Sequence, residues 1–221
     1  MGLLLRPLEL LFPSLCVLCT SQLEGEQVVC GRCLEGLPET GLGCWVTDTS
    51  VHEGLDGVWS AFWYDEQVQR LIHLLKYEGY RRLGRRLGEA AYRLLVDEIP
   101  WSQFDMLAPI PLHRTKKRER GYNQSAVLAR AVGGVSSVRV DAGLVVRHRW
   151  TQSQTGLSIE ERCENVLGSF RSTRPGGGKN VLLIDDVLST GATASACAQA
   201  LKSNGYGEVA VLTIATPQKG G

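Results

Sequence analysis

Hydrophobic positions alternate between two patterns from about residue 58 to the end of the chain. Mostly apolar runs, typical of buried strands, occur at 58–64, 104–112, 143–149, 181–185 and 208–216. Segments suited to helices, most of them with apolar residues at three- and four-residue spacing, lie at 65–79, 81–99, 125–132, 158–166 and 191–205. This order predicts an α/β fold with a mainly parallel sheet flanked by helices and joined by right-handed crossovers.

The position of polar residues relative to these strands indicates where a ligand binds. The run 181–185 has no polar alternation, as expected for a strand that is covered on both faces. Sheets of this kind bind ligands beyond the carboxyl ends of their strands. Asp185 ends one strand and the basic stretch 112–124, which we expect to be a polar loop, follows another.

Composition and charge narrow the class of protein. The 221 residues, 43% of them hydrophobic, suit one medium domain with a small appendage. The net charge of +1 excludes a protein that binds polyanions such as nucleic acid over its whole surface. The apolar start of the chain is interrupted by Arg6, Pro7, Glu9 and Pro13, is too short to span a membrane and has no signal-peptide pattern. We expect a cytoplasmic protein without a membrane span.

Five of the seven cysteines lie in the first fifth of the chain, which has little hydrophobic periodicity. This predicts a Cys-rich module at 1–50, followed by the main domain at 51–221. Without a secretory signal, paired C-x-x-C motifs favour zinc over disulfides, with free thiols as the alternative. The predicted zinc ligands are Cys16, Cys19, Cys30 and Cys33. Four thiolates leave no open position, so the zinc site would be structural.

The stretch LLIDDVLSTGATASA, residues 182–196, combines two kinds of chemistry. Asp185 and Asp186 at the strand end can accept hydrogen bonds from vicinal hydroxyls and can hold hydrated Mg²⁺. The following loop can surround a phosphate with backbone N–H groups and hydroxyls at the start of a helix. Its residues are Ser189, Thr190, Gly191, Ala192 and Thr193. The stretch therefore predicts a sugar phosphate with a metal-bound diphosphate; the alternative is a capped helix beside two solvated acids.

This stretch resembles the phosphoribosyl pyrophosphate (PRPP) motif of type I phosphoribosyltransferases. Three further segments, 71–88, 118–130 and 149–170, and the Cys-rich start are similar to those of the ComF/GntX family. The resemblance implies a type I phosphoribosyltransferase-like fold, a PRPP and Mg²⁺ site, and a role in natural competence, the uptake of transforming DNA. It assigns the ribose hydroxyls to Asp185 and Asp186 and the 5′-phosphate to the loop after them. It does not supply an acceptor substrate.

The basic stretch 112–124 has three interpretations. In the fold that the chain resembles, this segment cradles the pyrophosphate. The candidate residues for that role are Leu112, His113, Arg114, Lys117, Arg118 and Arg120. The alternatives are a solvated basic loop, or a surface for single-stranded DNA extended by Arg81, Arg82, Arg85 and Arg86. His113 is a candidate general base or an ordinary polar loop residue.

Two predictions rest on the family pattern alone. The segment 151–158 resembles a lid that closes over the substrate, and Gln154 and Arg162 match the family pattern. The alternative is that Arg162 and Asn165 pair structurally with neighbouring loops. The family often has a third cysteine pair, but here Thr47 stands where the partner of Cys44 would be, so Cys44 could replace one zinc ligand. The lone Cys163 and Cys197 are expected to be buried and inert.

Two hypotheses about function follow. The first is a phosphoribosyltransferase-like protein that binds PRPP and Mg²⁺, carries a zinc module and acts in DNA uptake. The second is a non-catalytic protein that retains the fold and binds single-stranded DNA or a DNA-uptake helicase. Turnover stays open, because no residue of the sequence clearly selects an acceptor.

Overall fold

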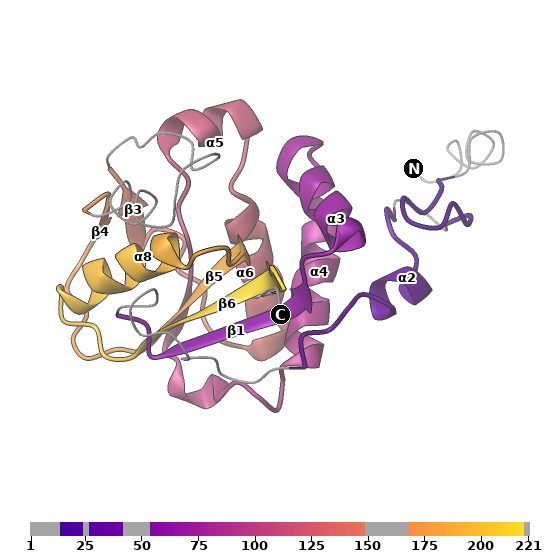
Figure 1. The fold of residues 1–221 in the computed structure, drawn as a ribbon. Helices are drawn as coiled ribbons and strands as arrows, with labels where there is room; N and C mark the ends of the chain where they lie inside the picture. The colour runs from indigo at the N-terminus through magenta and orange to yellow at the C-terminus, as the bar shows by residue number, and fades with distance from the viewer. Residues whose placement is uncertain (1–13, 24–26, 42–53, 149–167, 219–221) are drawn as a thin grey trace, which may run out of the picture.

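Four parallel strands form the central sheet of this computed structural model, which describes residues 14–23, 27–41, 54–148 and 168–218 (Figure 1). The strands, in spatial order, are β1 (Gly57–Trp63), β6 (Val209–Thr216), β5 (Val181–Val187) and β2 (Met106–Pro109). All three neighbouring pairs are parallel. The predicted mainly parallel sheet is therefore confirmed, and β5 lies inside it with its carboxyl end between those of β6 and β2.

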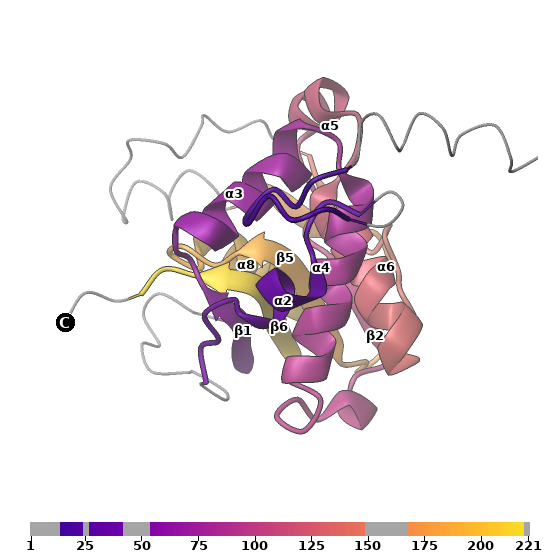
Figure 2. The same cartoon turned by 90° about the vertical axis from the view of Figure 1, so that its right-hand side faces the viewer.

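The sheet separates two hydrophobic clusters because strand residues point alternately to its two faces. Leu182 and Ile184 of β5 belong to the cluster that includes residues of α3 (Glu66–Tyr77), α4 (Arg81–Leu94) and α6 (Gln124–Ser136). Val181 and Leu183 belong to the cluster that includes α8 (Ala192–Lys202). Figure 2 shows α4 and α6 side by side along one face of the sheet. Both faces of β5 are covered, which explains its unbroken apolar run.

The ends of the elements differ from the predicted ends in several places. The run 104–112 contains a strand only at Met106–Pro109, and the helix expected over 81–99 ends at Leu94 and is followed by a short 3₁₀ helix, η1 (Trp101–Gln103). The last helix ends at Lys202 rather than at Gly205. The run 143–149 contributes the short β3 (Val145–Arg147), which pairs antiparallel with β4 (Phe170–Ser172). The helix expected at 158–166 lies outside the described residues.

The expectation of a loop over 112–124 is wrong, because this stretch contains the helix α5 (Arg114–Arg120). The ring nitrogen Nδ1 of His113 accepts a hydrogen bond from the backbone of Thr115, 3.2 Å away, and caps the start of the helix. Gly121, with φ of 76°, ends it in the left-handed conformation. None of the seven helical residues is buried, and Figure 1 shows α5 at the top of the molecule, apart from the sheet.

The described part of the cysteine segment packs against the main sheet and α4. The backbone of Thr40 donates to the carbonyl of Ala61 in β1 over 3.0 Å. Leu34 of α2 (Gly31–Glu35) lies in the same hydrophobic cluster as the α4 residues, and Arg86 of α4 donates to the carbonyl of Val29. The division expected between residues 50 and 51 lies outside the described residues and stays a prediction.

Among the described residues, no helix has both the length and the apolar character needed to cross a membrane.

Close packing of α4 on α6 depends on a glycine. A Cβ atom added at Gly88 would lie 2.7 Å from the Cβ of Ala131 and 3.1 Å from the carbonyl oxygen of Leu128. Neither atom can move without moving the α6 backbone. We expect Gly88→Ala to lower the free energy of unfolding by about 1–3 kcal/mol, as overpacked cores do, in urea denaturation.

The matched control is Gly134→Ala on α6, where a Cβ atom would meet nothing within 4 Å. There the substitution should be neutral or stabilise the protein by up to about 1 kcal/mol, because alanine loses less conformational entropy in a helix. Equal stability of the two variants would show that the contact between α4 and α6 does not need the glycine.

Candidate functional site

A pocket of about 250 Å³ opens where β5 ends. Asp185 and Asp186 line it, together with the whole predicted phosphate loop from Ser189 to Thr193. Lys76, Tyr64 and Thr213 lie on its other walls. The structure therefore brings together the aspartates and the loop that the sequence pattern joined, at the sheet edge where that pattern placed them.

The loop after β5 has the conformation that an anion site needs. Gly191 has φ of 78°, a left-handed value that glycine adopts at little cost, and it directly precedes the first residue of α8. The backbone N–H of Ala192 donates to Oγ1 of Thr190 over 3.4 Å, and the helix dipole adds partial positive charge at the first turn of α8. Ala192 and Thr193 of that turn line the pocket. The loop can thus hold an anionic oxygen group beside the aspartates.

Each aspartate is held by a side chain from the start of α6. The hydroxyl of Ser125 donates to Asp185 Oδ1 over 2.7 Å, and Nε2 of Gln124 donates to Asp186 Oδ1 over 3.3 Å. The cap residue Asn123 accepts from the backbone of Ser125 and donates to the carbonyl of Ile110 over 3.0 Å. The start of α6 is thereby tied to the end of β2 and presents its donors to β5.

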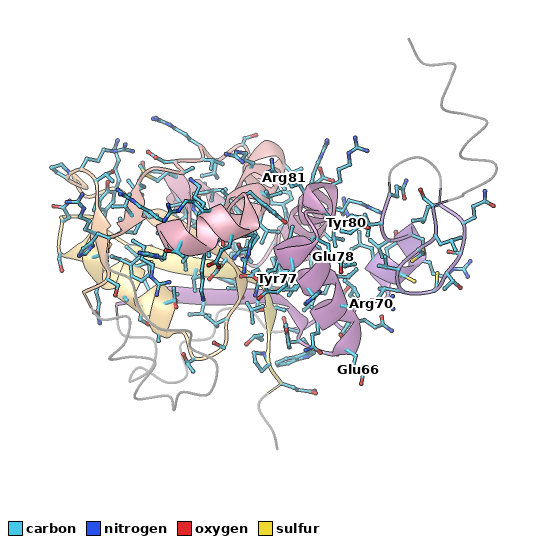
Figure 3. All side chains as sticks on the ribbon, turned by 90° about the horizontal axis from the view of Figure 1, so that it is seen from above. Glu66, Arg70, Tyr77, Glu78, Tyr80 and Arg81 are labelled. Atoms are coloured by element: carbon cyan, nitrogen blue, oxygen red, sulfur yellow. The ribbon has the colours of Figure 1, made fainter. Side chains whose placement is uncertain are left out.

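A third group reaches the pair from α3. Lys76 Nζ lies 2.5 Å from Asp186 Oδ2, and the side chain of Asp186 is only 6% exposed. Figure 3 shows Tyr77 and Glu78, the residues that follow Lys76, beside Tyr80 and Arg81 at the turn into α4. Lys76 thus enters the pocket from the last turn of α3.

The sequence predicts no role for three residues that contact the aspartates: Lys76, Gln124 and Ser125. Gln124 and Ser125 stand 62 and 60 positions from their partners, so spacing along the chain cannot connect them. The one available signal was that Lys76 lies in the family-like segment 71–88 and the other two lie in 118–130.

The two aspartates differ in protonation although they are adjacent. Burial and the neighbouring charge of Asp186 raise the pKa of Asp185 to about 8. Burial would also raise the pKa of Asp186, but the ammonium of Lys76 and the hydrogen bonds with Lys76, Asp185 and Gln124 together outweigh it and hold that pKa below its usual value. Burial lowers the pKa of Lys76, and the contact with Asp186 together with the charge of Asp185 more than compensates, so the pKa of Lys76 is raised. The ion pair between Lys76 and Asp186 therefore stays charged at neutral pH.

The aspartate pair does not fit direct coordination of Mg²⁺ in this arrangement. Carboxylate oxygens are ligands that Mg²⁺ prefers. However, Asp186 Oδ1 accepts from Gln124 and Oδ2 contacts the ammonium of Lys76. A divalent ion would have to displace Lys76 before Asp186 could bind it directly.

The predicted pyrophosphate residues lie at or before α5, and none of these described residues lines the pocket; Arg120 is connected to the aspartate pair through Gln124. Arg120 Nη1 donates to Gln124 Oε1 over 2.5 Å, and its guanidinium carbon lies 5.1 Å from the ring centre of Tyr77. Arg114, Lys117 and Arg118 are exposed, and Leu112 and His113 are half-buried. Burial, followed by the charges of Arg147 and Arg120, lowers the pKa of Lys116. Positive charge therefore gathers on α5, with Arg120 as its connection to the aspartates. The cap that His113 makes favours a structural role for this residue. Gln154 and Arg162 lie outside the described residues.

The four cysteines predicted to bind metal form one cluster. All four sulfur atoms lie within 4.8 Å of one another, and those of Cys19 and Cys30 are 3.7 Å apart. A tetrahedral centre with Zn–S bonds of about 2.3 Å separates its sulfurs by about 3.8 Å, so the cluster fits such an ion. Backbone N–H groups of Cys30 and Cys33 donate to cysteine sulfurs over 3.4 Å. Cys197 is fully buried in the α8 cluster, as expected. Cys44 and Cys163 lie outside the described residues.

Two solved structures that match this chain have low sequence identity and low structural similarity to it. Leishmania donovani UMP synthase has a TM-score of 0.38 at 19% identity, and the match covers 67% of this chain and 24% of that protein. The protein TT1426 from Thermus thermophilus has a TM-score of 0.36 at 16% identity, and the match covers 62% of this chain and 85% of that protein. At these scores the two structures add nothing to the topology described above. A scan against protein-family models finds no match.

Curated proteins give a clearer result. DNA utilization protein YhgH of Escherichia coli O6:H1 is 30% identical over 205 residues, 90% of this chain and 82% of that protein. Competence protein F of Haemophilus influenzae is 26% identical over 207 residues, 90% of this chain and 83% of that protein. Competence protein ComFC of Bacillus subtilis is 25% identical over 146 residues, 66% of this chain and 58% of that protein. With relatives matched over most of both chains, this chain belongs to the family of competence protein F and DNA utilization protein YhgH, the ComF/GntX family that its motifs resemble.

Proposed function

We propose that this protein binds PRPP in the pocket at the end of β5. The observation that carries the proposal is that one pocket holds both the aspartate pair and the phosphate loop. A phosphorylated ribose needs acceptors for its vicinal hydroxyls and donors for its phosphate, a few ångströms apart. Asp185 and Asp186 supply the acceptors, and the segment from Ser189 to Thr193 supplies the donors.

The positive charge at α5 suits the other end of the same ligand. In this proposal the pyrophosphate lies on the side of Arg120, and the exposed Arg114, Lys117 and Arg118 raise the local potential. The backbone near Leu112 and His113 contributes donors. Mg²⁺ enters with the pyrophosphate and neutralises its charge, since Asp186 is already paired with Lys76. Gln154 lies in the segment 151–158 proposed as a lid, and Arg162 follows it as the second residue proposed to act there.

The chemistry that this arrangement supports is displacement of pyrophosphate at the anomeric carbon of the ribose. Cationic groups beside the leaving pyrophosphate stabilise the negative charge that develops on it. The biological setting that we propose is DNA uptake in natural transformation, following the names of the relatives, competence protein F and DNA utilization protein YhgH.

We also propose that the cysteine cluster holds one structural Zn²⁺. The sulfur spacing fits a tetrahedral ion, and four thiolates leave no position for a substrate. The cluster lies in the segment that contacts α4 through Val29 and Arg86, away from the residues that line the pocket. Its role is therefore to hold this segment together rather than to take part in phosphoribosyl chemistry.

A second candidate function is binding of single-stranded DNA, alone or with a DNA-uptake helicase. The observation in its favour is that α5 presents its arginines and lysines without burying any residue. Two exposed aromatic rings lie at the turn between α3 and α4: Tyr77 is 66% exposed and Tyr80 is 39% exposed (Figure 3). Exposed rings beside cations are the usual means of holding unpaired bases.

PRPP with Mg²⁺ should raise the melting temperature of the wild-type protein. A ligand at a hundred times its dissociation constant stabilises the folded state by about 2.7 kcal/mol. The double substitution Asp185→Asn and Asp186→Asn should abolish the shift, because the ribose hydroxyls lose their carboxyl acceptors. Asp97→Asn, the same kind of substitution at an exposed position outside the pocket, should leave it intact. Absence of a shift in the wild type at millimolar PRPP would exclude the site.

The purified protein should contain about one equivalent of zinc, and a strong chelator should lower its melting temperature. Cys30→Ser should lose most of the metal because the tetrahedral set is then incomplete. Cys197→Ala should retain it, since that thiol lies in the α8 cluster. Zinc content below about half an equivalent in gently purified protein would contradict a structural site.

If α5 binds single-stranded DNA, the triple substitution of Arg114, Lys117 and Arg118 by Ala should weaken binding by about tenfold or more at low salt. The salt dependence should fall as well, because fewer counterions are released. Fluorescence anisotropy with a labelled oligonucleotide measures both effects. The control replaces two exposed arginines outside the pocket, Arg93 in the last turn of α4 and Arg139 after α6. Equal losses in both variants would remove α5 as a specific surface.

A further inference from the structure

We propose that Lys76 is the resident cation of the aspartate pair: it occupies the position that a divalent ion would take and so keeps the pocket open to a phosphate-bearing sugar. Lys76 is then a positioning residue that decides which class of ligand the two carboxylates accept. The metal part of this inference stands on geometry alone, and the sugar part rests on the proposed function.

The contact geometry shows that Lys76 is built into the site. Its ammonium lies 2.5 Å from Asp186 Oδ2, and the two side chains are 23% and 6% exposed. Gln124 occupies the other oxygen of Asp186, and Ser125 donates to Asp185. The neighbours of Asp186 thus include one cation and one neutral donor, which together engage both of its oxygens.

The position of Lys76 along the chain keeps its ammonium inside the pocket. Lys76 lies in the last turn of α3, and Gly79 with φ of 76° turns the chain toward α4. The apolar side of α3 is fully buried in the cluster that it shares with α4 and the sheet, at Leu71, Ile72 and Leu75. Because that side of the helix is fixed, the Lys76 side chain starts from a fixed point at the pocket wall.

The charge balance explains how carboxylates and a phosphate can share one small pocket. Two aspartates beside the phosphate loop would repel a phosphate, and this repulsion is stronger in a poorly solvated pocket than in water. One ammonium in direct contact with Asp186 cancels the charge of that carboxylate. Burial and the charge of Asp186 raise the pKa of Asp185 to about 8, so Asp185 adds little negative charge at neutral pH. A ligand phosphate at the loop then meets a pocket wall that is close to neutral.

The contact between Lys76 and Asp186 also disfavours binding of a metal ion to the carboxylates. A buried pair of carboxylates without a counter-ion is an oxygen-rich site that attracts divalent cations. With Lys76 in place, an ion that approaches Asp186 Oδ2 must displace an ammonium that is already in contact with it. Removing the positive charge of Lys76 should therefore weaken sugar phosphate binding and create metal binding.

The experiment compares Lys76→Met, which keeps an unbranched side chain of similar length and removes its charge, with Lys76→Arg, which keeps the charge. Binding of Mn²⁺ to the zinc-loaded protein, without any sugar phosphate, is followed by electron paramagnetic resonance. We expect Lys76→Met to bind Mn²⁺ at least about tenfold more tightly than the wild type, about 1.4 kcal/mol. Lys76→Arg and the wild type should behave alike. In metal-free buffer, Lys76→Met should bind ribose 5-phosphate at least about tenfold more weakly.

Two further variants make the result specific. Lys202→Met breaks the ion pair with Asp56, 2.7 Å long and outside the pocket, and should change neither affinity. Lys76→Met combined with Asp186→Asn should lose the gained Mn²⁺ site, and it keeps the test decisive if the single variant folds poorly. Tight Mn²⁺ binding by the wild type, or equal Mn²⁺ affinity of Lys76→Met and the double variant, would overturn the inference. If the wild type does not bind ribose 5-phosphate, the proposed function fails while the Mn²⁺ comparison still decides the role of Lys76.

Discussion

Burial of two adjacent carboxylates at the end of β5 is the constraint on which the rest of the site depends. An unpaired buried charge is costly, so a folded chain must bring donors or cations to it. Leu182 and Ile184 face the side of α3 and α6, and Asp186 continues that face by the pleat of the strand. Lys76 and Gln124 meet it there. The last turn of α3 and the first turn of α6 therefore lie beside Asp186.

The same constraint explains the form of the segment between β2 and α6. Asn123 donates to the carbonyl of Ile110, so the chain leaves the sheet and returns to almost the same place. The residues between these anchors form an excursion with α5 at its centre, and a helix that buries none of its residues can present its charged side chains to solvent. Its last residue, Arg120, remains connected to the pair because it donates to Gln124.

The sequence predicted the elements whose side chains are buried in the core. Continuous apolar runs located β5 and β6, and apolar periodicity located α3. Neither pattern could detect α5, because a helix that buries none of its residues has no apolar stripe. The run 143–149 indicated β3, whereas β4 is too short to give a pattern. In the site, the segment from Asp185 to Thr193 was predictable because its chemistry lies within a few residues. Lys76 and Ser125 were not, since their contacts are set by how helices pack on the sheet.

A chain of contacts runs from the basic helix to the acidic pair, from Arg120 through Gln124 to Asp186. Because Gln124 uses its oxygen for Arg120 and its nitrogen for Asp186, its amide orientation is fixed by both neighbours at once. A ligand that draws Arg120 away would free the Gln124 oxygen and loosen one of the two groups that hold Asp186. The pyrophosphate end and the ribose end of the proposed ligand are therefore connected through one amide, and Lys76 remains as the contact that does not depend on α5.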